Sequence, residues 1–250
     1  MVAHGKEDRY VSNMSTVASE SEEFVVVSAA DSSHYKSLCQ FLLSLFTHEP
    51  KIKAIVFDLG LKEYQSQCLQ DSFPKIDLRS FDYSIYPDYL DIRVNAGEYA
   101  WKPVIVYDVL NEFKSCVCWM DAGNIVTKPL KRIRTILRKV GMYSPRSSGR
   151  IVDWTHPKTL EFLGTSKNLL GKNNLNGACV AVSYNRSQAR DIIAKWKDCA
   201  LTRDCIAPPG SSRKNHRQDQ AVLSVLSHQT GITENMPSGY YGFKIHQDID

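Results

Sequence analysis

The stretch Cys116-Val-Cys-Trp-Met-Asp-Ala-Gly-Asn124 decides the fold, because a short apolar run ends there in an abrupt polar break. Consecutive apolar residues are typical of a strand that is buried on both faces, as in a parallel sheet. The polar break then falls at the carboxyl end of the predicted strand, where open α/β sheets bind their ligands. This strand end is therefore the first candidate for a functional site.

Buried strands alternate with amphipathic helices on both sides of this stretch. Short apolar runs predict strands at residues 24–28, 52–57 and 178–183, with shorter ones near 76–78 and 91–94. Apolar spacing and capping residues predict helices that open at residues 29–33 and near Lys102, and further helices at 62–70, 129–140, 155–163, 186–200 and 219–227. This order predicts an α/β fold with a mixed, mainly parallel sheet flanked by helices.

Length and composition describe an ordinary globular chain. Its 250 residues are 43% apolar and 23% charged, which predicts one domain over residues 24–250 after a polar, flexible leader at 1–23. The formal net charge of +4 is too small to indicate nucleic-acid binding by itself. No apolar run approaches the roughly 18 residues of a membrane span, and the leader lacks the order of a secretory signal. We expect a cytoplasmic protein, or one of the host cytoplasm if its source is a virus.

The seven cysteines form an odd set, and several of them lie inside apolar runs. Such thiols usually pack as small hydrophobic groups, so we expect a reducing compartment. Cys116 with Cys118, and Cys199 with Cys205, are the closest pairs in sequence. Neither pair has the spacing of a four-ligand zinc site.

Further polar residues follow the other strands or open helices. Asp31 and Asp58 follow the first two strands, although a turn cap explains each equally well. Asn176 and Gly177 precede a later strand and suit recognition of hydroxyl groups. Asp219 lies at a helix N-terminus, which favours a carboxylate.

Four motifs of the sequence resemble those of a known family. The motifs WMDAGN, EYAWKP, NGACVAVSYN and RQDQAVLSVL, in their order along residues 24–246, are similar to those of the nucleotide-diphospho-sugar glycosyltransferases of the GT-A fold. The nearest likeness is to small soluble enzymes of large algal DNA viruses. The resemblance implies a Rossmann-like, single-domain enzyme that moves a sugar from a nucleotide donor to a glycan or glycoprotein acceptor, with no nucleic-acid partner.

The resemblance also implies roles for individual residues. Asp121, with Ala122 and Gly123, stands where the family's Asp-x-Asp signature holds a divalent cation, usually Mn²⁺, against the donor diphosphate. Asn176, Gly177 and Gln220 match the sugar and acceptor shelf, Asp219 is the candidate catalytic base, and His246 with Asp121 would hold the metal. The remaining donor-binding positions are Ser28, Ala29, Ala30, Asp31, Asp58 and Lys102.

One residue departs from the family pattern. Gly123 replaces the second Asp of the signature, and a hard cation that loses a carboxylate is held less firmly. The alternative is metal independence, in which Lys102 and the cluster Arg213, Lys214 and Arg217 neutralise the leaving diphosphate. An inverting reaction would need Asp219 as a base, whereas a retaining one would not.

The resulting hypothesis is a glycosyltransferase that uses a UDP-sugar, such as UDP-hexose or UDP-xylose. A methyltransferase is one alternative, because residues 56–60 resemble the start of a glycine-rich cofactor loop, but the further glycines are missing. A non-enzymatic nucleic-acid-binding module is the other, suggested by the basic helix at 129–140. A solvated face over a buried one explains that helix better.

Overall fold

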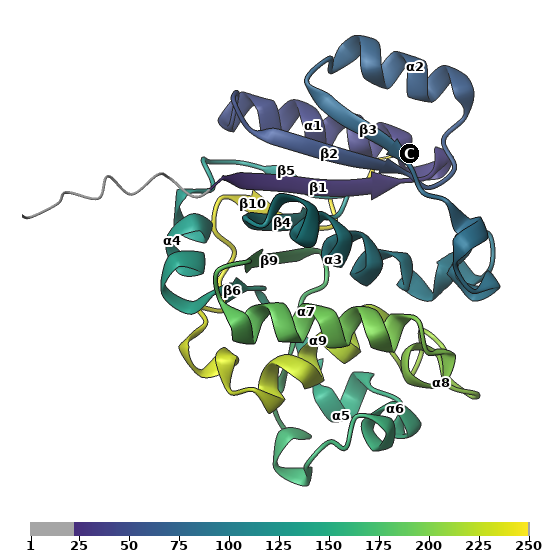
Figure 1. The fold of residues 1–250 in the computed structure, drawn as a ribbon, viewed down its shortest axis with the longest axis vertical. Coiled ribbons are helices and arrows are strands. Elements are labelled where there is room, and N and C mark those ends of the chain that lie inside the picture. The colour runs from purple at the N-terminus through teal and green to yellow at the C-terminus, as the bar shows by residue number, and fades with distance from the viewer. Residues whose placement is uncertain (1–22, 250) are drawn as a thin grey trace, which may run out of the picture.

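The computed structural model describes residues 23–249, so the predicted leader lies almost wholly outside the described residues. Within them, the main sheet has the strand order β3-β2-β1-β4-β9-β6 (Figure 1). The first four strands in this order are parallel, and β9 is antiparallel to both β4 and β6. These strands are β1 (Phe24–Ala30), β2 (Lys53–Asp58), β3 (Ile76–Ser80), β4 (Cys116–Met120), β6 (Met142–Tyr143) and β9 (Cys179–Ser183).

Successive side chains of the central strands feed two separate apolar cores, one on each face of the sheet. In β1, Val25 and Val27 belong to one core, while Phe24 and Val26 belong to the other. Helices α3 (Trp101–Phe113), α7 (Ser187–Ala200) and α9 (Gln218–Gln229) supply the first core, and α1 (Tyr35–His48), α2 (Glu63–Ser72) and α4 (Lys131–Val140) supply the second. A strand buried on both faces has no solvent side, which explains why the sequence runs are continuously apolar.

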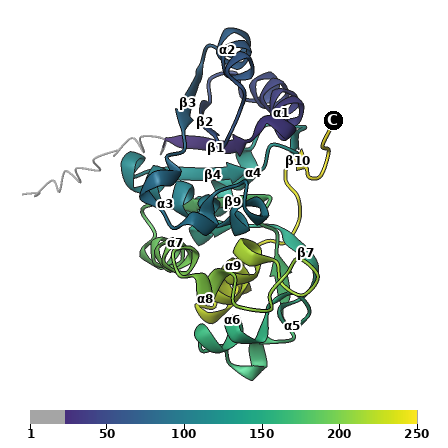
Figure 2. The same cartoon turned by 90° about the vertical axis from the view of Figure 1, so that its right-hand side faces the viewer.

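A smaller group of elements lies at the end of the molecule opposite α2 (Figure 2). Strands β7 (Arg146–Arg150) and β8 (Asn173–Leu175) pair there, beside α5 (Ile151–Trp154), α6 (Pro157–Phe162) and α8 (Arg203–Ile206). A second two-stranded pair joins β5 (Ile125–Val126), just after the end of β4, to β10 (Phe243–Lys244). The segment after β10 stays beside the end of β4, where the Gln247 amide donates to the Gly123 carbonyl at 2.7 Å.

The α/β fold and its mixed, mainly parallel sheet are confirmed, while several local predictions differ. The strand predicted at 91–94 is wrong: the chain between β3 and α3 forms the 3-10 turns Tyr83–Ile85, Asp88–Leu90 and Asn95–Tyr99. Ala29 and Ala30 continue β1 instead of opening a helix, because both pair with β2. Helix α6 begins at Pro157 and not at Thr155, since the His156 ring accepts the Lys158 amide as its N-cap.

The cysteines also differ in part from the prediction. Cys116, Cys118 and Cys179 are buried, as expected of small hydrophobic residues. Cys199 and Cys205, in contrast, form a disulfide that ties the end of α7 to α8. The prediction of separately packed thiols is therefore wrong for this pair. No helix in residues 23–249 has the length and apolar character needed to cross a membrane.

Candidate active site

Two adjoining pockets open at the carboxyl ends of β1 and β4. The strand-end pocket, with a volume of about 330 Å³, is bounded by Ala29 to Asp31 and by Ala122 to Asn124. The polar pocket lies beside it and is bounded by Ser147, Trp154, Gly177, Arg217 and Gln220. Residues that line both pockets are Tyr99, Lys102, Asp121, Ala178, Arg213 and His246. The two pockets therefore form one continuous site at the sheet edge predicted from the sequence.

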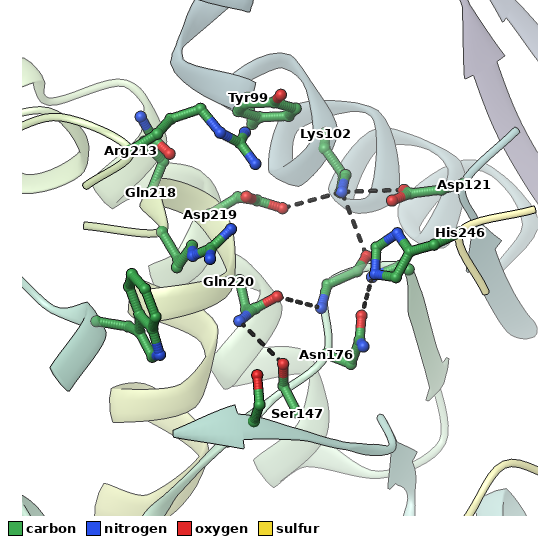
Figure 3. A pocket seen from close by; sticks show the side chains of 15 residues that line it. Tyr99, Lys102, Asp121, Ser147, Asn176, Arg213, Gln218, Asp219, Gln220 and His246 are labelled. Atoms are coloured by element: carbon green, nitrogen blue, oxygen red, sulfur yellow. Dashed lines mark hydrogen bonds and ion pairs between the residues drawn. The ribbon is translucent and has the colours of Figure 1, made fainter. Parts of the chain in front are cut away.

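Lys102 forms the centre of the site. It lies in the first turn of α3, and its ammonium is 3.0 Å from Asp121 Oδ1, 3.0 Å from Asp219 Oδ2 and 3.3 Å from the Gly177 carbonyl (Figure 3). The ammonium therefore donates to the Gly177 carbonyl and forms ion pairs with two carboxylates, although the Asp219 Oδ2 contact lacks the geometry of a hydrogen bond. The family resemblance implies that Lys102 faces the donor diphosphate, whereas in the structure its ammonium is buried between the two aspartates.

Burial and charge act in opposite directions on this cluster. Burial lowers the pKa of Lys102, but attraction to Asp121 and Asp219 outweighs it, so the pKa of the ammonium is raised. Burial raises the pKa of Asp219, and the Lys102 ammonium offsets this only in part. Asp219 thus combines a protected position with a pKa moved toward neutrality, as a general base requires. No second cation is ion-paired with Asp219 within residues 23–249.

Asp121 is held by strand β4 and by α3 together. Its Oδ1 accepts the Trp119 indole N–H at 2.6 Å as well as the Lys102 ammonium, while the side chain stays 37% exposed. Asn124 lies behind it, fully buried, and donates to the Ala178 carbonyl. One carboxylate oxygen of Asp121 consequently remains available to a ligand in the pocket.

Gly123, the departure in the signature, lies against Asp248. A Cβ atom built on Gly123 would lie 2.3 Å from Asp248 Oδ1, so the Asp248 carboxylate fills the space that a side chain at position 123 would need. Asp248 and His246 line the strand-end pocket together with Asp121. Nothing in the sequence pattern singled out Asp248, because only the return of the chain at β10 brings it here.

These residues bear on the expected metal. Within residues 23–249, no three His, Cys, Asp or Glu side chains converge closely enough to hold an ion by themselves. Divalent cations in phosphate sites are commonly held by one or two carboxylates together with substrate oxygens. Asp121 and the Asp248 carboxylate that replaces the missing side chain fit such a shared site.

The shelf expected at Asn176 and Gly177 faces α9. Gln220 Oε1 accepts the Gly177 amide at 3.3 Å, and Asn176 Nδ2 donates to the Tyr240 hydroxyl at 3.1 Å. A Cβ on Gly177 would lie 3.1 Å from Asp219 Oδ2, so glycine allows the close approach of the two segments. Asn176 and Gly177 therefore lie against Asp219 and Gln220.

The predicted donor residues of the first two strands fall into two groups. Ala29, Ala30 and Asp31 line the strand-end pocket, whereas Ser28 is buried inside β1 beneath it. A hydrogen bond to the His34 ring holds the pKa of Asp31 well below its usual range. Asp58 does not line either pocket: its Oδ1 accepts the Gly60 and Leu61 amides, which is the turn-capping alternative considered from the sequence.

The comparisons with known proteins agree with this architecture. The chain shares its fold with the galactosyltransferase LgtC, solved with donor and acceptor sugar analogs: the TM-score is 0.53 at 18% identity, over 81% of this chain and 70% of that one. It matches the core-mannan synthase A of Aspergillus fumigatus, solved with Mn and GDP, with a TM-score of 0.59 at 10% identity over 88% and 73%. The mannosyltransferase Ktr4p of S. cerevisiae matches with a TM-score of 0.51 at 9% identity over 90% and 70%.

These likenesses define the class: the chain has the α/β fold of the GT-A glycosyltransferases. At the level of sequence, residues 4–107 match the family described as "Protein of unknown function (DUF1647)". No curated protein matches the sequence. The narrower resemblance to enzymes of algal viruses finds no support in these comparisons.

Proposed function

We propose that the chain is a glycosyltransferase that moves a sugar from a nucleotide donor, a UDP-sugar, to a hydroxyl group of a glycan acceptor. The observation that carries the proposal is the cluster of Lys102, Asp121 and Asp219 at the junction of the two pockets. A nucleotide in the strand-end pocket would place its sugar against this cluster. The fold supports the same reading by analogy only, because folds are shared among many functions.

The chain's own residues would divide the chemistry. Asp219, held by Lys102, would take the proton of the acceptor hydroxyl, a step that contributes about 10²- to 10⁴-fold. Arg213, which lines both pockets, would face the charge that develops on the leaving diphosphate. Asn176 and Gln220 would orient the sugar hydroxyls.

A cation would be held by Asp121 and Asp248, with His246 beside them. When bound, Mn²⁺ would stabilise the negative charge of the diphosphate as a Lewis acid. The Lys102 ammonium already neutralises part of the aspartate charge without a metal. Metal dependence is therefore a property to measure.

The two alternatives lose support from particular contacts. The methyltransferase alternative needs a cofactor loop after β2, but the Asp58 carboxylate is occupied by its own turn. The nucleic-acid alternative rests on the basic face of α4, but Arg134 is ion-paired with Glu49 at 2.6 Å and the apolar face of the helix is buried, as in an ordinary solvated helix over a core.

A thermal-shift panel tests the proposal. UDP, GDP, UDP-glucose and UDP-xylose would each be added with and without Mn²⁺. A ligand at about 100 times its Kd stabilises the folded chain by roughly 2.7 kcal/mol, or roughly 5 to 10 °C in Tm for a domain of this size. The absence of a shift with every nucleotide would refute the proposal.

Asp219→Asn tests the role of the base. We expect transfer to fall at least 100-fold while the UDP-induced shift stays within about 1 °C, since general-base help is worth about 10²- to 10⁴-fold. Asn111→Asp, on the outer part of α3, is the control for a conservative change at a distance. Unchanged turnover in Asp219→Asn would remove this residue from the catalytic role.

A further inference from the structure

Two arginines at the site have no carboxylate partner. Arg79, Arg93, Arg134 and Arg150 each pair with an acidic residue elsewhere in the molecule. Several other arginines, including Arg213 and Arg217, form no ion pair within residues 23–249, but of these only Arg213 and Arg217 line the polar pocket. Arginine in a polar pocket without a protein acceptor is suited to an anionic ligand, because its five N–H donors match carboxylates and sulfates.

Aromatic rings hold both guanidinium groups from one side. Arg213 Cζ lies 4.8 Å from the centre of the Tyr99 ring, and Arg217 Cζ lies 4.2 Å from that of Trp154. A guanidinium that stacks on a ring keeps its in-plane N–H groups free for a ligand. Both arginines are thus supported by protein while their hydrogen-bonding edges remain available.

The segment that carries the two arginines is anchored in the protein. His216, between them in sequence, is fully buried: its Nε2–H donates to the Ile206 carbonyl and its Nδ1 accepts the His156 amide. The Asn215 side chain accepts the Ser212 amide and donates to the Gly210 carbonyl. This anchoring of the backbone reduces the conformational entropy that Arg213 and Arg217 lose when a ligand binds.

Trp154 is also held in place, by contacts with the backbone. Gly149 has φ +76°, and a Cβ there would lie 2.3 Å from the Trp154 indole nitrogen, so the ring rests directly on the backbone of β7. The Arg217 amide also donates to the Trp154 carbonyl at 3.0 Å. The indole that carries the Arg217 guanidinium therefore has a fixed position in the polar pocket.

Arg217 lines only one of the two pockets. Arg213 lines both, but Arg217 and Trp154 line only the polar pocket. Lys102 contributes no free charge, because its ammonium is already paired with Asp121 and Asp219. The Arg217 charge is therefore available to an anionic group of a ligand in the polar pocket.

We propose that the polar pocket recognises an acidic sugar, a uronate or a sulfated sugar, whose anionic group binds Arg217 beside Trp154. The proposal rests on the proposed glycosyltransferase function and narrows its substrate class. The acidic sugar is either the transferred sugar of the donor or a unit of the acceptor. The shared chemistry is a carboxylate or sulfate on a pyranose ring.

The test has two arms, each a titration of the purified chain with matched ligands. The donor arm compares UDP-glucuronic acid with UDP-glucose. The acceptor arm, without nucleotide, compares cellobiuronic acid and cellobiose 6-sulfate with cellobiose. We expect an acidic ligand to bind at least tenfold more tightly than its neutral counterpart in one arm, and that arm identifies the source.

Arg217→Gln should reduce this preference to less than twofold while leaving the affinity for UDP unchanged. Arg132→Gln is the matched control, since Arg132 stacks on Tyr241 at 5.6 Å outside the two pockets, and it should change neither property. Equal binding of acidic and neutral ligands in both arms would overturn the proposal, as would an acid preference that survives Arg217→Gln. A failure of UDP to bind would refute the proposed function instead, because the acceptor arm does not depend on it.

Discussion

Replacing Lys102 with Met should destabilise the protein strongly and in a way that depends on pH. The change removes the ammonium that lies 3.0 Å from both Asp121 and Asp219, and it leaves Asp219, whose side chain is only 7% exposed, as a buried charge. Removing one partner of a buried ion pair typically costs about 3 to 5 kcal/mol. For a domain of this size the loss corresponds to roughly 6 to 20 °C in Tm.

The pH dependence follows from Asp219. Its pKa is already raised by burial, and loss of the ammonium raises it further, so the folded variant binds a proton that the unfolded chain releases above its ordinary pKa of 3.8. Stability of such a variant falls as pH rises. The deficit of Lys102→Met should therefore be large at pH 8 and small near pH 4.5. Urea unfolding at both pH values measures it.

Two further variants isolate the cause. Lys102→Met combined with Asp219→Asn no longer buries a lone charge at position 219, so it should recover most of the stability lost at pH 8. Lys53→Met is the control, because Lys53 pairs with Glu23 at 3.7 Å on the surface, where such pairs contribute about 0 to 1 kcal/mol. A deficit below about 1 kcal/mol at pH 8, or a double variant no more stable than the single one, contradicts this electrostatic explanation.

Three other changes test separate parts of the structure. Burial lowers the pKa of His216 from 6.5 to about 4. The unfolded chain therefore binds a proton that the folded chain excludes, and the free energy of unfolding falls by roughly 3 kcal/mol as pH falls from 6.5 to 4. His216→Gln should flatten this part of the profile of unfolding free energy against pH. Replacing both Cys199 and Cys205 with Ser should lower the free energy of unfolding by about 2 kcal/mol, because the disulfide closes a short loop. Urea titration measures this loss, and the reduced wild-type protein should show the same loss. Gly123→Asp should cost no more than about 0.5 kcal/mol, because the exposed Asp248 carboxylate can move away from the new side chain, and calorimetry would show this.

The sequence predicted the sheet well because its strands are buried on both faces and therefore appear as continuous apolar runs. β4 and β9 are the clearest cases, and Asp121 at the end of β4 lies in the site as expected. In the segment from Tyr83 to Tyr99, the strand predicted near 91–94 was wrong. The segment's Tyr and Asp side chains resemble strand and loop residues alike, while the chain uses them in successive 3-10 turns.

The site was predicted in part for a related reason. Asp219 and Gln220 begin a helix, a position that sequence patterns can identify. The partners of those residues depend on contacts far apart in the chain: Trp154 reaches the pocket through β7 and α5, and Asp248 reaches it through β10. Lys102 was placed in the right region, but its three partners come from three different segments, so its buried role followed only from the packing.

The return of residues 243–249 to the end of β4 has a consequence for how the protein is made. Synthesis supplies β1, β2 and β4 early, and these strands can pair as soon as they leave the ribosome. His246 and Asp248 join Asp121 only after more than a hundred further residues have followed. A nascent chain can thus hold a nearly complete sheet while its pocket still lacks one wall, which makes ligand binding a late event that reports completed folding.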